Sequence, residues 1–220
     1  MKFTSNVLVV ANGIFPSKGE IAELFKLDYT IVCCDGAVDK LVKAGYTPDI
    51  IIGDLDSISM NNKTKYKDIL IHVNKQDNND LEKALSWLDD KNIKFATILG
   101  ADGGRDDHAL GNLLLLLEKK FSYNIEMQTE SGIFTVINTN LIKKDKTGNY
   151  IKNIKSNKNQ SISLFCTNRD AIFSSEGLKY ELENFRFTKL HSASLNSAVS
   201  DSFSIACNQT NILMLVYREN

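Results

Sequence analysis

The sequence has almost no net charge. Its 26 Lys and Arg residues are offset by 27 Asp and Glu residues, which leaves a formal charge of −1 at pH 7. A protein that binds nucleic acid or an acidic membrane through its overall charge carries a basic excess. The sequence therefore gives no electrostatic indication of either partner, and we expect it to bind neither.

Long apolar runs and secretion signals are also missing. No apolar stretch approaches the ~20 residues that cross a bilayer. Residues 1–11 lack the basic start, the full apolar stretch and the small-residue cleavage pattern of a signal peptide. None of the four cysteines forms a C-x-x-C pair, which favours free buried thiols in a reducing compartment. We accordingly expect a cytoplasmic protein.

Two common nucleotide-binding motifs are absent. The sequence contains neither the G-x-x-x-x-G-K-[ST] phosphate loop nor the G-x-G-x-x-G fingerprint. Other groups must therefore hold any nucleotide that this protein binds. The chain of 220 residues, 43% of them hydrophobic, is long enough for one large domain or two small domains with a substantial core.

The first 120 residues alternate between apolar, β-branched runs and segments with helical spacing. Leu81, Ala84, Leu85 and Leu88, for example, recur at the spacing of one helix face. This alternation predicts a parallel sheet that is covered on both sides by helices. Strands are expected at residues 6–11, 30–34, 50–52, 69–73 and 95–99.

The pattern changes in the second half of the chain. Residues 143–159 are rich in Lys and Asn and are interpreted as a linker or a long hairpin loop. From residue 160 onward, short strand-like runs separated by turn residues indicate a small antiparallel sandwich. The predicted fold is an α/β parallel-sheet nucleotide-binding domain at residues 1–142, followed by a smaller all-β antiparallel sandwich domain at residues 160–220.

Two acidic residues follow one of the predicted buried strands. Asp54 and Asp56 come directly after residues 50–52 and Gly53, and ligands bind at the carboxyl ends of strands in open α/β sheets. Two carboxylates ~4 Å apart repel each other by ~4 kcal/mol at an effective dielectric constant of ~20. A cation would relieve this repulsion, and oxygen ligands suit Mg²⁺. Alternatively, one Asp caps the next helix and the other is solvated.

Three further strand ends carry acidic or glycine-rich loops: Asp35-Gly36, the segment from Gln76 and Asp77 to Asp80, and the segment from Gly103 to His108. In a parallel sheet all of these loops lie at one edge. Glycines let backbone N–H groups approach phosphate oxygens, and Arg105 can hold a phosphate as a bidentate donor. Together these groups indicate phosphoryl-type transfer.

Other interpretations of single residues remain open. An ion pair between Arg105 and Asp106 is the structural alternative to phosphate binding. Glu82 and Lys83 are expected on the solvated side of their helix, and Tyr180 is expected in the core of the sandwich.

The acidic motifs, taken as a set, resemble those of the thiamine pyrophosphokinase (thiamine diphosphokinase) family. The resemblance covers nearly the whole chain and includes Gly177-Leu178-Lys179-Tyr180 in the second domain. It implies an α/β domain and a β-sandwich assembled as a homodimer, with each thiamine site formed between the catalytic domain of one subunit and the sandwich of the other. The implied reaction transfers the pyrophosphoryl group of ATP to the thiamine hydroxyl and releases AMP. The motifs that carry the resemblance are Asp35-Gly36-Ala37, Pro48-Asp49, Gly53 to Ser57, Gln76-Asp77, Asp80 to Leu85 and Gly103 to His108.

The resemblance also implies roles for individual residues. Asp54, Asp56 and Asp80 are the implied Mg²⁺ ligands, with Asp35 close by, and Asp77 or Asp80 is the implied acceptor of the hydroxyl proton. Catalytic roles therefore fall on Asp54, Asp56, Asp77 and Asp80. Roles in binding the nucleotide fall on Asp35, Gly36, Gln76, Gly104, Arg105, Asp107 and His108.

The sequence departs from the family pattern at two places. The family carries Asp-Gly-Gly where this chain has Asp35-Gly36-Ala37, and a Ser-Asn pair where this chain has Ser194-Leu195-Asn196. Ser194 and Asn196 are the implied thiamine-binding residues.

Two other functions are compatible with parts of the sequence. A haloacid-dehalogenase-type phosphatase also has a hydrophobic strand that ends in Asp-x-Asp, with Asp54 as the nucleophile and Asp56 as the acid/base. That motif normally lies on the first strand, whereas here it follows the third. A catalytically silent nucleotide-binding or thiamine-binding module is the second alternative, although a binder has no need to concentrate so many carboxylates.

Overall fold

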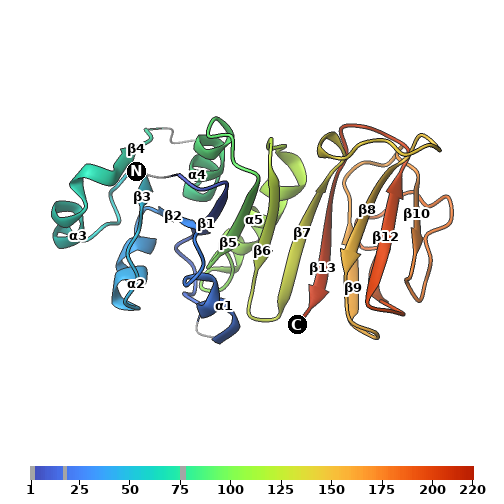
Figure 1. Ribbon diagram of the computed structural model, residues 1–220, viewed down its shortest axis with the longest axis horizontal. Coiled ribbons are helices and arrows are strands. Elements are labelled where there is room, and N and C mark those ends of the chain that lie inside the picture. Colours follow the sequence, from blue (N-terminus) through green and yellow to red (C-terminus); the bar gives the residue numbers. More distant parts are fainter. Residues whose placement is uncertain (1–2, 17–18, 75–77) are drawn as a thin grey trace. The chain divides into compact units, whose positions relative to one another are not determined.

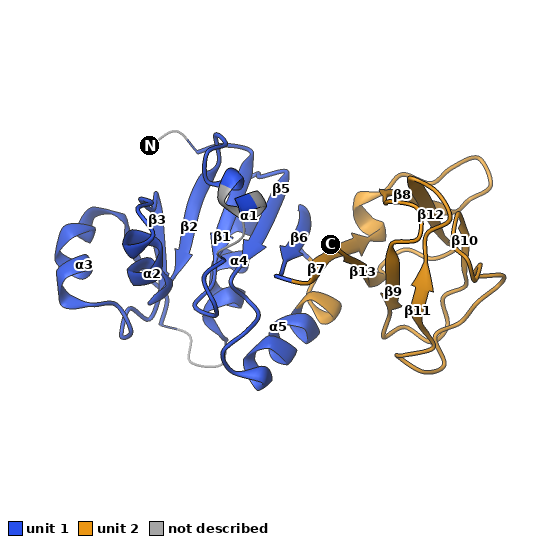
Figure 2. Ribbon diagram, turned by 90° about the horizontal axis from the view of Figure 1, so that it is seen from below, with its two compact units in different colours: residues 1–115, 121–130 blue, residues 116–120, 131–220 orange. Residues whose placement is uncertain are grey.

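The structure is a computed structural model that describes residues 3–16, 19–74 and 78–220, and the chain divides into two compact units (Figures 1 and 2). Unit 1 consists of residues 1–115 and 121–130, and unit 2 consists of residues 116–120 and 131–220.

Unit 1 is an α/β unit. Its elements are β1 (Asn6–Val10), α1 (Gly19–Leu24), β2 (Thr30–Cys34), α2 (Ala37–Lys43), β3 (Ile50–Gly53), α3 (Met60–Lys65), the 3₁₀ turn η1 (Lys67–Ile69), β4 (Leu70–His72), α4 (Asp80–Asp89), β5 (Phe95–Leu99), α5 (Asp106–Glu118, whose last residues belong to unit 2) and β6 (Asn124–Gln128).

The strands of unit 1 form a parallel sheet in the order β6-β5-β1-β2-β3-β4. The five predicted strands are confirmed. Sequence analysis did not predict β6, because its residues Asn-Ile-Glu-Met-Gln look polar. Only Ile125 and Met127 of β6 are buried, in strict alternation with half-buried polar residues.

Both faces of this sheet are buried, as parallel sheets require. Leu8, Val10 and Cys33 pack with Val38 and Leu41 of α2 in one apolar cluster. Side chains alternate between the two faces along a strand, so the neighbouring, fully buried Val7 and Val9 belong to the opposite face. On α4 the residues Leu81, Ala84, Leu85 and Leu88 are buried, which confirms the predicted apolar stripe.

The strand order places a switch point at β1. From β1 the sheet extends to β2, β3 and β4 on one side and to β5 and β6 on the other. Ligand sites in open α/β sheets lie outside the carboxyl ends of the strands at such a point. The loops after β1 and β5 border this position.

Unit 2 contains two antiparallel sheets, in the orders β11-β9-β13-β7 and β10-β12-β8. Phe173, Phe203 and Ile205 from one sheet share a buried cluster with Leu164 and Val216 from the other. Two sheets around one core form a sandwich, which confirms the predicted fold class. The elements are β7 (Gly132–Asn138), the 3₁₀ turn η2 (Thr139–Leu141), β8 (Tyr150–Lys155), β9 (Ser161–Phe165), β10 (Phe173–Glu176), β11 (Ala193–Ser197), β12 (Ser202–Cys207) and β13 (Leu213–Glu219).

The boundary between the compact units differs from the predicted domain limits. Residues 131–142 belong to unit 2, and residues 143–159, interpreted as a linker or hairpin loop, contain the strand β8. The Lys and Asn residues of β8 conceal its strand character, since Ile154 is its single buried residue. Pairing with β12 along the whole of β8 supplies the order that its composition does not indicate.

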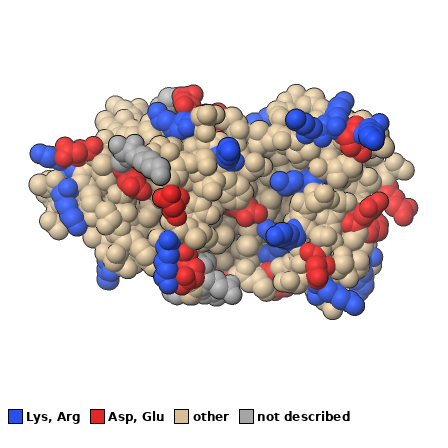
Figure 3. Space-filling view, in the orientation of Figure 1, with Lys and Arg blue, Asp and Glu red and all other residues tan. Residues whose placement is uncertain are grey.

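Over the part of the chain that the structure describes, no helix is long and apolar enough to cross a bilayer. Figure 3 shows basic and acidic side chains interspersed on the face that it presents.

The core of unit 2 yields a stability prediction. Phe173 is 1% exposed and its ring meets the ring of Phe187 edge-on, with centroids 5.3 Å apart. Phe173→Ala should lower the free energy of unfolding by ~3–5 kcal/mol, because it removes buried area and leaves a cavity. Urea unfolding followed by circular dichroism measures this loss. Tyr180→Ala is the control, because Tyr180 is 62% exposed and its loss should cost at most ~0.5 kcal/mol.

Candidate active site

A cavity of about 750 Å³ opens at the carboxyl edge of the sheet in unit 1. The loops after β1, β3 and β5 and the first turns of α4 and α5 line it. Its polar and glycine lining includes Asn12, Gly13, Asp54, Ser57, Asn79, Asp80, Lys83, Gly100, Gly103, Gly104, Arg105, His108 and Asn112.

Backbone hydrogen bonds join the loops after β1 and β5. The N–H of Gly13 donates to the carbonyl oxygen of Gly100 at 2.7 Å, and the N–H of Ile14 donates to that of Asp102 at 3.1 Å. A Cβ at Gly13 would lie 2.5 Å from the Gly100 carbonyl oxygen, so only glycine fits there. These bonds fix one wall of the cavity at the switch point of the sheet.

Asp35 is a buried carboxylate directly after β2. It is 1% exposed, and its Oδ2 accepts a hydrogen bond from the N–H of Ser57 at 3.2 Å. Its Oδ1 has no hydrogen-bond partner among the described residues. Burial raises the pKa of the Asp35 carboxyl, and the negative charges of Asp80 and Asp54 raise it further, against the opposing hydrogen bond from Ser57. A buried oxygen without a partner is a position at which a cation would be stabilised.

Asp35 belongs to a group of three carboxylates. One oxygen each of Asp35, Asp54 and Asp56 lies within 4.8 Å of the other two. Leu55, between Asp54 and Asp56, has a φ of 65°, in the left-handed region that a leucine seldom adopts. This turn helps to bring the exposed carboxylates of Asp54 and Asp56 to the buried one of Asp35. An all-oxygen donor set with an unpaired buried member fits a hard divalent ion such as Mg²⁺.

Asp80 is joined to this group through Lys83, which corrects one expectation. Lys83 is buried rather than solvated, and its side chain is 3% exposed. Its Nζ donates to Asp80 Oδ1 at 2.9 Å and to Asp54 Oδ2 at 3.1 Å. The hydrogen bond from Lys83 is the main cause that lowers the pKa of Asp54. The metal role of Asp80 stays a prediction, since the group of three described carboxylates does not include it.

Asn79 and Asn112 form a link that sequence analysis missed. Asn79 Oδ1 accepts from the N–H of Glu82 at 2.8 Å and so caps α4. Asn79 Nδ2 donates to Asn112 Oδ1 at 3.1 Å, and Asn112 Nδ2 donates to the Ala101 carbonyl oxygen at 2.8 Å. The start of α4 is thereby tied to the loop after β5. The sequence signal that could have revealed this link is Asn112, a polar residue within the leucine-rich helix α5.

The glycine-rich loop after β5 contributes Gly104, Arg105 and His108 to the cavity lining. Arg105 pairs with Asp107 rather than with Asp106. Its Nε and an NH₂ group donate to the Asp107 carboxylate at 3.1 and 2.6 Å. These bonds lower the pKa of Asp107 to about 2. Asp107 is thus placed beside Arg105, while its predicted contact with a nucleotide stays a prediction.

The remaining described residue of the predicted nucleotide site is a glycine. Gly36 precedes α2, and a Cβ there would lie 2.9 Å from Asn12 Nδ2 and 3.0 Å from Ser57 Cβ. Gly36 therefore allows the loops after β1, β2 and β3 to meet. Gln76 and Asp77 lie outside the described residues.

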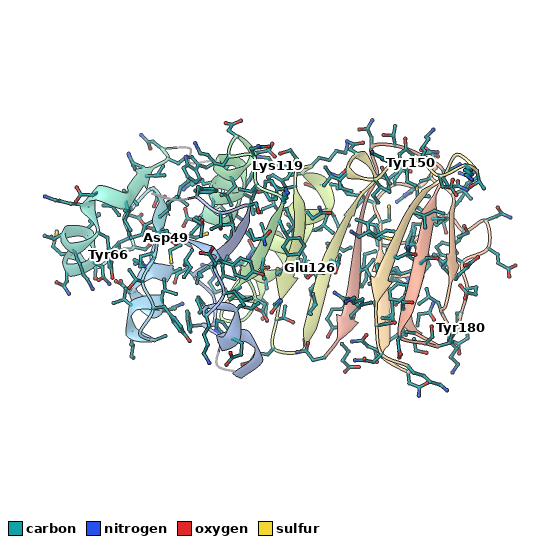
Figure 4. The ribbon with its side chains drawn as sticks, in the orientation of Figure 1. Asp49, Tyr66, Lys119, Glu126, Tyr150 and Tyr180 are labelled. Carbon is teal, nitrogen blue, oxygen red and sulfur yellow. The ribbon has the colours of Figure 1, made fainter. Side chains whose placement is uncertain are left out.

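A further motif residue has a structural place. The carboxylate of Asp49, labelled in Figure 4, accepts a hydrogen bond from the N–H of Ile31 at 2.8 Å. It fixes the start of β2 against the residue that precedes β3.

The predicted thiamine-binding residues Ser194 and Asn196 lie on β11 of unit 2. Asn196 is buried, accepts from the N–H of Tyr180 at 3.0 Å and donates to its carbonyl oxygen at 2.7 Å. Tyr180, labelled in Figure 4, is 62% exposed, so the expectation of a core position was wrong. The polar atoms of Asn196 hold the backbone at residue 180 and leave its ring at the surface. The extra residue, Leu195, is absorbed as a bulge with a φ of 61°.

The fold and the site define an α/β protein with a group of three carboxylates and a glycine-lined cavity, followed by a β-sandwich. Two family models match the chain. Thiamin pyrophosphokinase, catalytic domain, matches residues 21–127, and Thiamin pyrophosphokinase, substrate-binding domain, matches residues 148–217. The Thiamin pyrophosphokinase 1 of Caenorhabditis elegans is 31% identical over 185 residues, which cover 78% of this chain and 73% of that protein. The chain therefore belongs to the thiamin pyrophosphokinase family, and it is a pyrophosphotransferase.

Other relatives agree with this assignment. The Thiamine pyrophosphokinase of Bacillus subtilis is 29% identical over 154 residues, covering 67% of this chain and 68% of that protein. A solved structure of Thiamine pyrophosphokinase from Bacillus subtilis has a TM-score of 0.78 at 20% identity and covers 98% of this chain and 99% of that one. The Thiamin pyrophosphokinase structure from Candida albicans has a TM-score of 0.76 at 20% identity, covering 99% of this chain and 90% of that one. The two structures show the fold, and the roles of single residues stay predictions.

The contact between β3 and Asp35 can be tested at Gly53. A Cβ at Gly53 would lie 2.8 Å from the Cβ of Asp35, so Gly53→Ala must displace the buried carboxylate. We expect a loss of ~1–3 kcal/mol in unfolding free energy. The shift in melting temperature on adding Mg²⁺ should also be smaller than in the unsubstituted protein.

Gly111→Ala is the matched control. Gly111 lies in α5 with nothing within 4 Å of the added Cβ, so alanine should raise stability by up to ~1 kcal/mol. An unchanged Mg²⁺ response in Gly53→Ala would contradict the placement of Asp35 at the cation site.

Proposed function

We propose that this protein transfers the pyrophosphoryl group of ATP to the hydroxyl of thiamine, in a Mg²⁺-dependent reaction that gives thiamine diphosphate and AMP. The observation that carries this proposal is the gathering of Asp35, Asp54 and Asp56 within 4.8 Å of one another. They lie beside a glycine-lined cavity, in a chain that matches both domains of the family.

Asp35, Asp54 and Asp56 would hold the Mg²⁺, with Asp80 next to them. When bound there, the ion supplies positive charge that offsets the charge of a triphosphate. The carboxylates of Asp54 and Asp56 are exposed and can meet a metal that arrives with the nucleotide, whereas Asp35 is fixed by burial. Asp35 thus fixes the position of the site. The turn at Leu55 brings Asp54 and Asp56 to it.

The phosphate chain fits the glycine-lined part of the cavity. Gly103 and Gly104 have φ values of 71° and 77°. Nothing lies within 4 Å of the position that a Cβ would take at Gly104, so an anion can approach the backbone there. At Gly103 the side chain of Ile14 fills that position. Arg105 lines the same cavity and is 72% exposed. Its ion pair with Asp107 is weak because both groups are solvated. Arg105 can therefore exchange Asp107 for a phosphate, while His108 and Gly36 border the nucleotide.

The hydroxyl proton of thiamine requires an acceptor. Asp80 lines the cavity at the start of α4, and its carboxylate is 33% exposed. We assign the proton to Asp80 or to Asp77, with Gln76 beside the phosphates or the thiamine alcohol. Asp77 and Gln76 lie three residues or more before α4, in the segment outside the described residues.

The second unit would complete the enzyme. The model that matches residues 148–217 describes a substrate-binding domain, which supports a thiamine-binding role for the sandwich and for Ser194 and Asn196. We propose a homodimer in which the sandwich of one subunit meets the catalytic unit of the other. The four free, buried cysteines support a reducing compartment and hence the cytoplasm.

The function is tested by AMP formation. Protein, ATP and Mg²⁺ should release AMP only when thiamine is added, and EDTA should stop the reaction. Asp54→Asn should lower kcat at least ~100-fold, because the amide keeps the shape of the carboxylate but loses its charge. Circular dichroism checks that the variant is folded.

The same assay separates the alternatives. A haloacid-dehalogenase-type phosphatase with Asp54 as its nucleophile would release inorganic phosphate without thiamine. A silent binding module would release nothing. Near-normal AMP formation by Asp54→Asn would contradict the proposed metal role of Asp54.

A further inference from the structure

The described lining of the cavity in unit 1 contains three cationic side chains that differ in their partners. They are Lys40, Lys83 and Arg105. Lys83 and Arg105 form ion pairs with carboxylates, which offset their charges. Lys40 forms no ion pair with any residue that the structure describes. Its positive charge is therefore the one that no neighbouring carboxylate in the described chain offsets.

Two main-chain carbonyl groups hold the ammonium of Lys40 in place. Its Nζ donates to the carbonyl oxygen of Asn12 and to that of Gly13, both at 2.7 Å. An ammonium group has three N–H donors, so one donor remains after these two bonds. Because the carbonyl groups carry no net charge, they fix the position of the ammonium without cancelling its charge.

The carbonyl groups that hold Lys40 belong to the wall of the cavity. The N–H of Gly13 donates to the carbonyl oxygen of Gly100 at 2.7 Å, which ties the loop after β1 to the loop after β5. Lys40 reaches this wall from α2, the helix that directly follows Asp35 and Gly36. The cation is thus held at the switch point of the sheet, where ligands of open α/β sheets bind.

We propose that Lys40 is a phosphate-binding residue of the nucleotide site and that its third N–H donates to an oxygen of the triphosphate chain. This inference rests on the proposed function, and it adds a residue that lies outside the acidic and glycine-rich motifs. Arg105 must release Asp107 before it binds a phosphate, whereas Lys40 has no carboxylate to release among its described contacts. A cation that is already held in position also loses less freedom when the ligand binds.

Bracing of the loop after β1 is the structural alternative for Lys40. In that role the side chain would serve only to hold the two carbonyl groups. Any neutral side chain that still donates to them would then preserve the affinity for the nucleotide. A contact with phosphate instead requires the positive charge, and its contribution falls at high salt because ions screen exposed charges.

The test measures binding of AMP-PNP, a nonhydrolysable analogue of ATP, to the full chain by isothermal titration calorimetry, with Mg²⁺ and without thiamine. Lys40→Met should raise the Kd about tenfold at low salt, because a charge-assisted hydrogen bond is lost. At about 0.5 M NaCl the increase should shrink to less than about threefold. Lys40→Arg keeps the charge and should stay within about threefold of the original Kd.

Two further variants separate charge from bracing. Lys40→Gln keeps an N–H donor for the carbonyl groups and removes only the charge, so it should lose as much affinity as Lys40→Met. It also supplies the test if Lys40→Met does not fold. Lys43→Met is the matched control, because Lys43 lies in the same helix but does not line the cavity. Its Kd should change by less than about twofold.

The inference is overturned if folded Lys40→Met keeps its Kd within about twofold, if Lys40→Gln restores the affinity, or if salt does not reduce the loss. The binding measurement needs no turnover, so it stands apart from the AMP assay. If AMP forms but the Lys40 variants bind AMP-PNP normally, only this inference fails. If the variants bind as described but the unsubstituted protein forms no AMP, the proposed function fails and the role of Lys40 stands.

Discussion

Repulsion between carboxylates at one edge of a parallel sheet is the constraint on which the rest of unit 1 depends. Each pair of such charges at ~4 Å costs ~4 kcal/mol at an effective dielectric constant of ~20. The fold gathers Asp35, Asp54 and Asp56 nonetheless. It can do so because rigid strands fix the loops and because Lys83 and the Ser57 N–H offset part of the charge. The negative charge that remains is the reason for proposing a cation at this site.

Sequence reasoning predicted the main features of the fold and the acidic edge, and the physical cause is clear. The strands β1, β2, β3 and β5 are buried on both faces, so their composition alone identifies them. The acidic loops follow those strands directly, and parallel pairing brings Asp35, Asp54 and Asp80 to one edge whatever their separation in sequence. These inferences need only local patterns and one topological rule.

The features that sequence reasoning missed depend on contacts between distant segments. Lys83 lies on the side of α4 away from its apolar stripe, and a charged residue there is normally solvated. The loop after β3 brings Asp54 over it, which no periodicity within α4 reveals. The link from Asn79 to Asn112 likewise joins two residues that are 33 positions apart in the sequence. In unit 2, β8 and the exposed Tyr180 are set by pairing and by Asn196 rather than by composition.

The backbone hydrogen bonds between the loops after β1 and β5 affect which positions of the cavity wall can vary in sequence. These bonds run from main chain to main chain, through Gly13, Ile14, Gly100 and Asp102. The side chain of Ile14 is 55% exposed and takes no part in them. A substitution at such a position leaves the backbone of the cavity wall in place and changes only the side chain that the wall carries. The architecture thus separates the residues that preserve shape from those that are free to adjust selectivity.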